Sequence, residues 1–272
     1  MLIGPACILI VIFKLYPILR TLIEGVFYNG HWGLETYIRL FHDNTFWNSL
    51  WVTIKMNIVI TPIQLVISLI FAFLVSTAVK GISVFRTIYY LPVTISLTVA
   101  TLLWNMMFDV NSGILNSILN TIGIPNQGFF IDKKQALWCI VAIANWKGVG
   151  YWMMFLLAGL KGIDTSIYES AILDGATWFK RTIYITLPLI KNTILFVLVA
   201  DTTSNMLLFA PMQIVTRGGP QGSTNVLMYE AYKSAFQFVD RSRSSAIVTI
   251  LLIMIGTICV FQFKLLTTEE ED

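Results

Sequence analysis

Charged residues are scarce in this sequence, and the scarcity excludes most soluble folds. Of its 272 residues, 12% are charged and 56% are hydrophobic, whereas a typical soluble domain carries about 25% charged residues. The formal net charge is +3, and no block of basic residues indicates a nucleic-acid partner. We therefore predict that the chain lies in a lipid bilayer.

Cysteine and histidine are too few for a disulfide framework or a metal site. Cys7, Cys139 and Cys259 each fall in an apolar run, where cysteine packs as a small hydrophobic residue. The two histidines, His31 and His42, share one loop that has no neighbouring cysteine ligand. We expect neither a metal nor a cofactor.

Motifs for nucleotide binding and catalysis are missing as well. The phosphate-binding pattern Gly-x-x-x-x-Gly-Lys-Ser/Thr does not occur in the sequence. No Ser/His/Asp, Cys/His or paired-carboxylate arrangement has the spacing of a catalytic site. A multi-span membrane enzyme would need such groups, so we expect a chain that is not an enzyme and that depends on a partner for energy.

Six apolar runs are long enough to cross a membrane. A spanning helix needs about 20 mostly apolar residues, and continuous runs favour helices over the alternating strands of a barrel. The predicted fold is an all-α integral membrane protein with six transmembrane helices. The predicted spans are residues 2–26, 50–79, 85–108, 136–160, 187–215 and 244–266. We expect residues 1–45 to form the first span and an outer loop, 46–266 the core, and 267–272 an acidic tail.

A polar segment at residues 163–188 interrupts the apolar runs. Ser166 and Glu169 have the spacing of a capping box, which predicts a helix starting at about Ser166. The pair Asp174-Gly175 predicts the end of this helix, because glycine tolerates a left-handed stop. A second helix is expected from about Ala176. The segment therefore predicts a helix-turn-helix bracket whose small elbow residues suit docking into a groove on a partner.

Several motifs resemble one known family. Glu169-Ser170-Ala171, Asp174-Gly175-Ala176 and Ile185-Thr186-Leu187-Pro188 are similar to the EAA loop of permease subunits in bacterial ATP-binding cassette importers, in the maltose-permease-like branch. Two shorter matches are Arg86 with Leu91-Pro92, and Thr216 followed by Gly218-Gly219-Pro220. The sequence departs from the family at Ser170, where alanine is usual, and at Lys191, where a second proline is common.

The resemblance implies a type I importer permease fold and a set of partners. These are a second permease subunit in a heterodimer, two ATP-binding cassette ATPases and an extracellular solute-binding protein. It places the chain in a bacterial plasma membrane, with the bracket and the C-terminus in the cytoplasm. The residues implied in ATPase coupling are Glu169, Ser170, Ala171, Asp174, Gly175, Ala176, Leu187 and Pro188, and those implied in binding-protein docking are Gly218, Gly219 and Pro220. Glu169 can also serve only as a helix cap.

A solute path is expected where polar side chains fall inside the spans. Polar residues at membrane depth usually line a path or a site, and amides, hydroxyls and aromatic rings suit a neutral polyhydroxyl solute. The candidates are Asn57, Asn105, Asn145, Trp146, Tyr151, Asp201, Ser204 and Asn205. Interhelical hydrogen bonding is the alternative role for the cluster around Asp201.

The predicted function is ATP-driven import of a sugar or oligosaccharide. Import of a polyol or glycerol phosphate is the alternative. A channel or sensor without an ATPase is less favoured, because it would have no use for the bracket.

Overall fold

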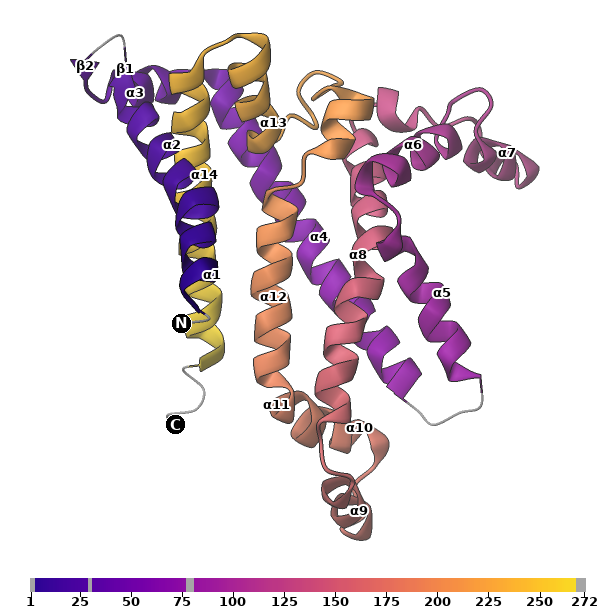
Figure 1. Ribbon diagram of the computed structural model, residues 1–272. Helices are drawn as coiled ribbons and strands as arrows, with labels where there is room; N and C mark the ends of the chain where they lie inside the picture. The colour runs from indigo at the N-terminus through magenta and orange to yellow at the C-terminus, as the bar shows by residue number, and fades with distance from the viewer. Residues whose placement is uncertain (1–2, 29–30, 77–80, 268–272) are drawn as a thin grey trace.

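The computed structural model describes residues 3–28, 31–76 and 81–267, and most of them are helical (Figure 1). The predicted acidic tail beyond residue 267 lies outside the described residues. The N-terminal elements are α1 (Ile3–Ile10), η1 (Val11–Leu15), α2 (Tyr16–Val26), β1 (Phe27–Tyr28), β2 (His31–Trp32) and α3 (Glu35–Phe41). The central elements are α4 (Asn44–Ser76), α5 (Ile82–Thr94), α6 (Leu97–Met107), α7 (Ile114–Thr121), η2 (Phe129–Ile131) and α8 (Ala136–Lys161). The C-terminal elements are α9 (Thr165–Leu173), α10 (Trp178–Arg181), η3 (Thr182–Thr186), α11 (Leu187–Leu189), α12 (Lys191–Met206), η4 (Met212–Thr216), α13 (Leu227–Tyr232), η5 (Lys233–Gln237) and α14 (Arg241–Thr267).

Four described helices are long and apolar enough to cross a membrane. They are Gly4–Val26, Asn44–Ser76, Ala136–Lys161 and Arg241–Lys264. Two further spans are each made of a bent helix pair, which gives six if each pair is one span. The second span starts at Asn44, before the predicted residue 50, because the Asp43 carboxylate accepts the Thr45 N–H at 2.7 Å and starts the helix ahead of the apolar run.

The third span is not the continuous helix predicted over residues 85–108. It bends by 97° between α5 and α6. Pro92 lies in the last turn of α5, and the carbonyls that this helix end leaves unpaired are bound by Lys147 of α8. Its Nζ donates to the carbonyl oxygens of Val93 at 3.3 Å and Ile95 at 2.7 Å. Ser96 then caps α6 by accepting the Val99 N–H.

The fifth span also differs from its prediction over residues 187–215. The helix pair Trp178–Leu189 and Lys191–Met206 bends by 68°, with Ile190 in a non-helical conformation at the junction. Pro188 lacks the N–H that would continue a regular helix, and the π-helical turn η3 precedes it. α12 then ends at Met206, so residues 207–215 lie outside this helix.

The centre of the fold is the long contact between α4 and α8, which glycine makes close. A Cβ on Gly148 would lie 1.6 Å from the Gln64 amide nitrogen, and a Cβ on Gly150 would lie 2.0 Å from the Tyr89 carbonyl oxygen. Only glycine lets α8 approach α4 and α5 at these positions.

The two ends of the helical bundle carry different structures. The bracket formed by α9, α10, η3 and α11 projects from one end, and β1, β2, α3, α7 and α13 lie at the other (Figure 1). The N-terminal α1 and α2 lie beside α14, at the edge of the bundle (Figure 1). Many apolar side chains on α1 are exposed in the single chain, including Ile8, Leu9 and Ile10, as expected for a surface that faces lipid or another subunit.

Candidate solute path and coupling bracket

A cavity lined by apolar surface and by several polar side chains lies between α4, α8 and α12, inside the spanning region. Its volume is about 250 Å³. The lining side chains come from α4, from α8, from α12 and from the bend between α5 and α6. They are Gln64, Val93, Leu97, Ala144, Lys147, Gly148, Tyr151, Trp152, Asp201, Ser204, Asn205 and Leu208.

Asp201 is the charged group at the centre of this cavity. Its side chain is 1% exposed. The Oδ1 atom accepts hydrogen bonds from Trp152 Nε1 at 2.7 Å and from Asn205 Nδ2 at 2.9 Å. The second oxygen, Oδ2, is buried, and no hydrogen bond to it is recorded from the described residues, although the Thr61 side chain lies beside this carboxyl group. Protein atoms cover this oxygen, so a solute would reach it only if the surrounding side chains moved.

Asn205 ties the cavity to neighbouring helices. Its Nδ2 lies 3.2 Å from both Thr61 Oγ1 and Gln64 Oε1, and Gln64 Nε2 donates to the Ala144 carbonyl at 2.9 Å. These bonds join α12 to α4 and α4 to α8. The Asp201 cluster thus contributes to interhelical packing and lines a cavity at the same time.

Lys147 closes the cavity on the side of the bent third span. Besides Val93 and Ile95, its ammonium lies 3.4 Å from the Pro92 carbonyl oxygen. Its donors are therefore directed at backbone carbonyls, and no ion pair between Lys147 and Asp201 is recorded among the described residues.

The eight predicted path residues fall into three groups. The cavity around Asp201 is lined by four of them: Tyr151, Asp201, Ser204 and Asn205. Asn145 and Trp146 line a neighbouring cavity of about 350 Å³ against α5. Asn57 is buried and donates to the Thr202 carbonyl at 3.0 Å, whereas Asn105 is exposed on α6, apart from both cavities.

Among the lining residues that carry polar side-chain atoms, three were not predicted from the sequence: Gln64, Lys147 and Trp152. A signal for the first exists, because Asn57, Thr61, Gln64 and Ser68 recur at helical spacing and form one polar face of α4. Tryptophan at 152 has no such signal, since a tryptophan in an apolar run reads equally well as packing.

The bracket forms as a helix-turn-helix, but its first cap differs from the prediction. α9 begins at Thr165, and Asp164 is its N-cap, accepting the Ser166 N–H at 2.9 Å. The predicted capping box between Ser166 and Glu169 is therefore wrong. Asp164 precedes the helix in an extended conformation, which Ser166, inside the first turn, does not have. This leaves the Glu169 side chain exposed.

The elbow of the bracket is built on Gly175. Its φ is +76°, the left-handed conformation predicted for the helix stop. The Ala176 N–H closes the turn on the Ala171 carbonyl at 2.9 Å, and Thr177 then caps α10. A Cβ on Gly175 would meet nothing within 4 Å in this chain, so the elbow is open to a partner.

The remaining bracket residues divide by exposure. Ala171 is buried, and the hydroxyls of Tyr168 and Thr186 lie 3.0 Å apart, which ties α9 to η3. Ser170, Asp174 and Pro188 are exposed, whereas Ala176 and Leu187 are half-buried.

Leu173, which the sequence interpretation missed, lies at the end of α9 and is 89% exposed. An exposed leucine on a rigid projection is typical of a protein contact.

The Gly-Gly-Pro loop lies at the opposite end from the bracket. Gly218 is buried with a φ of +79°, and the Gly219 carbonyl accepts from Thr224 Oγ1 at 2.7 Å. Pro220 is half-buried. These residues shape the loop, and side chains around them would make any contact with a partner.

The comparison with known proteins decides the family. The family described as "Binding-protein-dependent transport system inner membrane component" matches residues 45–266. The chain belongs to this family. The permease is 33% identical to the lactose transport system permease protein of Rhizobium radiobacter, over 96% of this chain and 91% of that protein. It is 30% identical to the sn-glycerol-3-phosphate transport system permease protein of Salmonella choleraesuis, over 97% of this chain and 92% of that protein.

A solved structure has the same fold as the permease. A bacterial alginate ABC transporter, in complex with an alginate pentasaccharide-bound periplasmic protein, matches with a TM-score of 0.85 and 21% identity. The match covers 95% of this chain and 90% of the other. The predicted fold, that of an all-helical importer permease, is confirmed, and the permease is a membrane component of a transport system.

Proposed function

We propose that the permease moves a neutral polyhydroxyl solute, a sugar or short oligosaccharide, across a bacterial plasma membrane as one subunit of an ATP-driven importer. The observation that carries this proposal is the cavity around Asp201, which combines apolar surface with hydrogen-bonding groups. The exposed hydroxyl of Ser204 can bond to a solute hydroxyl, and the exposed ring of Tyr151 offers a face for the apolar side of a sugar ring. The lactose permease relative supports the same solute class.

The lining of the cavity offers few groups that would bind an anion, which favours a neutral solute. Lys147 is the lining cation, and its ammonium already donates to backbone carbonyls. Import of glycerol phosphate, which the second relative supports, would require this lysine to leave those carbonyls.

The proposed assembly contains a second permease, two ATPase subunits and an extracellular solute-binding protein. The bracket would lie in the cytoplasm and seat in a groove on one ATPase, with Glu169, Leu173 and Gly175 at the contact. Closure of the ATPases would then move the bracket and, through η3 and α11, the fifth span. The bend at Ile190 means that this connection changes direction between the bracket and α12. The loop around Gly218, Gly219 and Pro220 would face the binding protein.

Uptake measured in cells that co-express the permease with its neighbouring genes tests the proposal. The labelled solutes would be a disaccharide, glycerol phosphate and a uronate oligosaccharide. We expect saturable, ATP-dependent uptake of the disaccharide alone. Uptake of either anion with no uptake of the disaccharide would contradict the proposed solute class.

Asp201→Ala separates transport from assembly in the same cells. We expect uptake to fall at least about tenfold, the size of one lost hydrogen bond to a charged group, while the yield of purified complex stays near that of the wild type. Thr203→Ala is the matched control, because Thr203 is on the same helix and bonds to the Val199 carbonyl away from the cavity. A collapse of complex yield in Asp201→Ala would assign the cluster to packing alone.

A further inference from the structure

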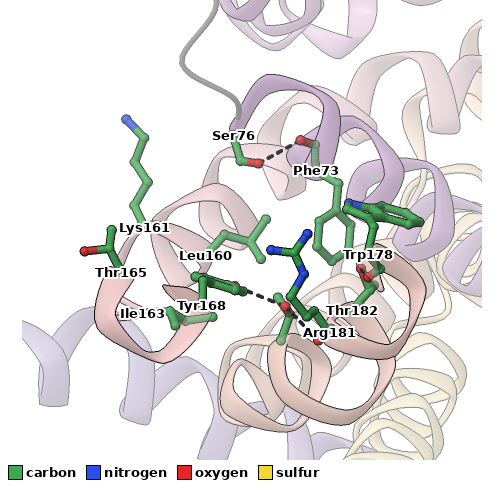
Figure 2. Close-up of a pocket in the computed structure, with 11 residues that line it drawn as sticks. Phe73, Ser76, Leu160, Lys161, Ile163, Thr165, Tyr168, Trp178, Arg181 and Thr182 are labelled. Carbon is green, nitrogen blue, oxygen red and sulfur yellow. Dashed lines mark hydrogen bonds between the residues drawn. The ribbon is translucent and has the colours of Figure 1, made fainter. Parts of the chain in front are cut away.

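A second cavity lies inside the bracket, apart from the solute path. Its volume is about 370 Å³, which falls in the range of small-ligand sites. It is enclosed by the bracket on one side and by the ends of α4 and α8 on the other (Figure 2). The lining residues are Phe73, Ser76, Leu160, Lys161, Ile163, Thr165, Tyr168, Trp178, Arg181, Thr182 and Thr186.

Arg181 places a guanidinium group in the middle of this cavity. Figure 2 shows the group pointing away from its own helix, into the space between Leu160 and Phe73. Its Nε is buried and has no hydrogen-bond partner among the described residues. The bonds recorded at this residue use its backbone: the N–H donates to the Thr177 carbonyl at 3.0 Å, and the carbonyl accepts from Thr186 Oγ1 at 3.2 Å. A guanidinium is always charged, and a buried N–H of this group without an acceptor is unfavourable.

The surroundings of Arg181 make the cavity positively charged. Lys161 stands at the rim (Figure 2), and none of the described lining residues is acidic. Asp164, which lies between the lining residues Ile163 and Thr165 in the sequence, is exposed. Its carboxylate accepts the Ser166 N–H as the cap of α9. The cavity therefore contains a cationic hydrogen-bond donor, and no carboxylate among its described lining residues balances that charge.

The position of the cavity limits what can enter it. It lies where two spans end, and Trp178, Phe179 and Tyr184 next to it are 64%, 65% and 75% exposed. Exposed aromatic residues at the end of a span are typical of the membrane–water interface. A ligand can therefore approach from the lipid headgroup layer or from the cytoplasmic solution.

We propose that this cavity binds a phosphate-bearing anion, supplied either as the headgroup of an anionic lipid or as a soluble phosphate ester. Arg181 pairs with the phosphate in the forked geometry that guanidinium and phosphate share. Lys161 and Thr165 also line the cavity, but Figure 2 shows their polar ends directed outward, away from Arg181, so they would meet a ligand only by rotating toward it. A bound anion would join the bracket to the ends of α4 and α8.

Ligand binding to the purified full-length permease in detergent tests the proposal. Native mass spectrometry would follow titration with phosphatidylglycerol and with phosphatidylcholine, and thermal unfolding would follow titration with inorganic phosphate. We expect the wild-type permease to bind either phosphatidylglycerol or inorganic phosphate, with phosphatidylcholine as the lipid of no net charge for comparison. Arg181→Gln should weaken that binding at least about tenfold, as expected for a lost charge-assisted hydrogen bond. Lys180→Gln, which removes a neighbouring exposed cation outside the cavity, should change it less than about twofold.

The two probes distinguish the source of the anion. Arg181-dependent binding of phosphatidylglycerol that inorganic phosphate does not displace identifies a lipid headgroup. Arg181-dependent stabilisation by inorganic phosphate, without selective phosphatidylglycerol binding, identifies a soluble ester. Equal binding of both probes by wild type and Arg181→Gln overturns the proposal.

A second variant guards against misfolding of Arg181→Gln. Thr165→Glu adds a negative charge at the rim without removing a buried contact, and an acidic residue suits the first turn of a helix. It should weaken the binding of the same probe, and unchanged binding would count against the site. The assay contains no partner subunit and measures no transport, so its outcome is independent of the proposed import function.

Discussion

Gly150 sets the distance between α8 and α5 at the level of a single residue. A Cβ there would lie 2.0 Å from the Tyr89 carbonyl oxygen, a backbone atom that cannot rotate away. We expect Gly150→Ala to destabilise the folded permease by about 1–3 kcal/mol, the usual cost of overpacking. The measurement is thermal unfolding of the purified protein in detergent.

Gly256→Ala provides the control for this substitution. Gly256 lies in α14, and an added Cβ there meets nothing within 4 Å. Alanine should leave the stability unchanged or raise it slightly, because it is the better helix former. Equal stability of the two variants would show that the contact between α5 and α8 can relax.

Glu230 gives a residue-scale prediction about pH. Its carboxylate is buried and bonds to Lys233 Nζ at 2.6 Å, Asn225 Nδ2 at 2.8 Å and Arg243 Nη2 at 2.9 Å. Burial raises the pKa of Glu230, but the hydrogen bonds from Lys233 and Asn225 outweigh it and hold the pKa below its usual value. A carboxyl group with a lowered folded pKa stabilises the protein above its unfolded pKa, about 4.3, and this contribution is lost as pH falls through the folded pKa.

Glu230→Gln should therefore destabilise the permease in a pH-dependent way. At pH 7 we expect a loss of about 3 kcal/mol, as for a broken buried pair. The difference from wild type should shrink in unfolding experiments carried out at progressively lower pH, below about 4. A difference that stays constant through this range would mean that the charge of Glu230 contributes nothing.

Single residues also show how far sequence can predict a site. Asp201 was predictable because an ionisable side chain inside an apolar run is costly to bury and usually marks a path or a binding site. Trp152, its hydrogen-bond donor, was not, because tryptophan is common in spans for packing alone. Asp164 was missed because serine and glutamate offered a familiar pattern two residues further on, and only the backbone conformation decides which residue caps the helix.

The bracket is the element on which coupling to an ATPase would depend. Gly175→Ala and Gly175→Trp impose the same strain at a φ of +76°, and neither β-carbon meets another atom of this chain within 4 Å. The two variants differ in the bulk that they present to a partner. We expect Gly175→Trp to abolish uptake and ATPase co-purification, whereas Gly175→Ala retains both, with a stability loss of about 1 kcal/mol.

Glu169→Lys tests the polar side of the same surface. Glu169 is exposed and is not the cap of α9, so charge reversal should spare the fold. We expect lower uptake with normal amounts of permease in the membrane, measured on the same blots. Co-purification of the ATPase with Gly175→Trp at the wild-type level would contradict the role proposed for the bracket.

Four of the six predicted spans are single long helices among the described residues, and the other two correspond to bent helix pairs, which makes six if each pair is one span. Length and hydropathy locate these segments, since both depend on local composition. The bends in the third and fifth spans were missed because their causes are not local. Pro92 alone is compatible with a mild kink, and the 97° bend depends on Lys147, more than fifty residues away in the sequence.

The orientation of the whole molecule is open to direct measurement. With Cys7, Cys139 and Cys259 replaced by serine, Leu173→Cys would mark the tip of the bracket and Gln221→Cys the loop at the other end of the bundle (Figure 1). A membrane-impermeant maleimide should label Gln221→Cys in intact spheroplasts and Leu173→Cys only in inverted vesicles. The reverse pattern would place the bracket outside and exclude cytoplasmic coupling.

The ammonium of Lys147 connects the wall of the cavity around Asp201 to the bend between α5 and α6. Three carbonyls at the break depend on it, and the same side chain lines the cavity. The size of this cavity and the geometry of the bend therefore depend on the same group. A substitution of Lys147 that enlarges the cavity should also change the angle at which α5 and α6 meet.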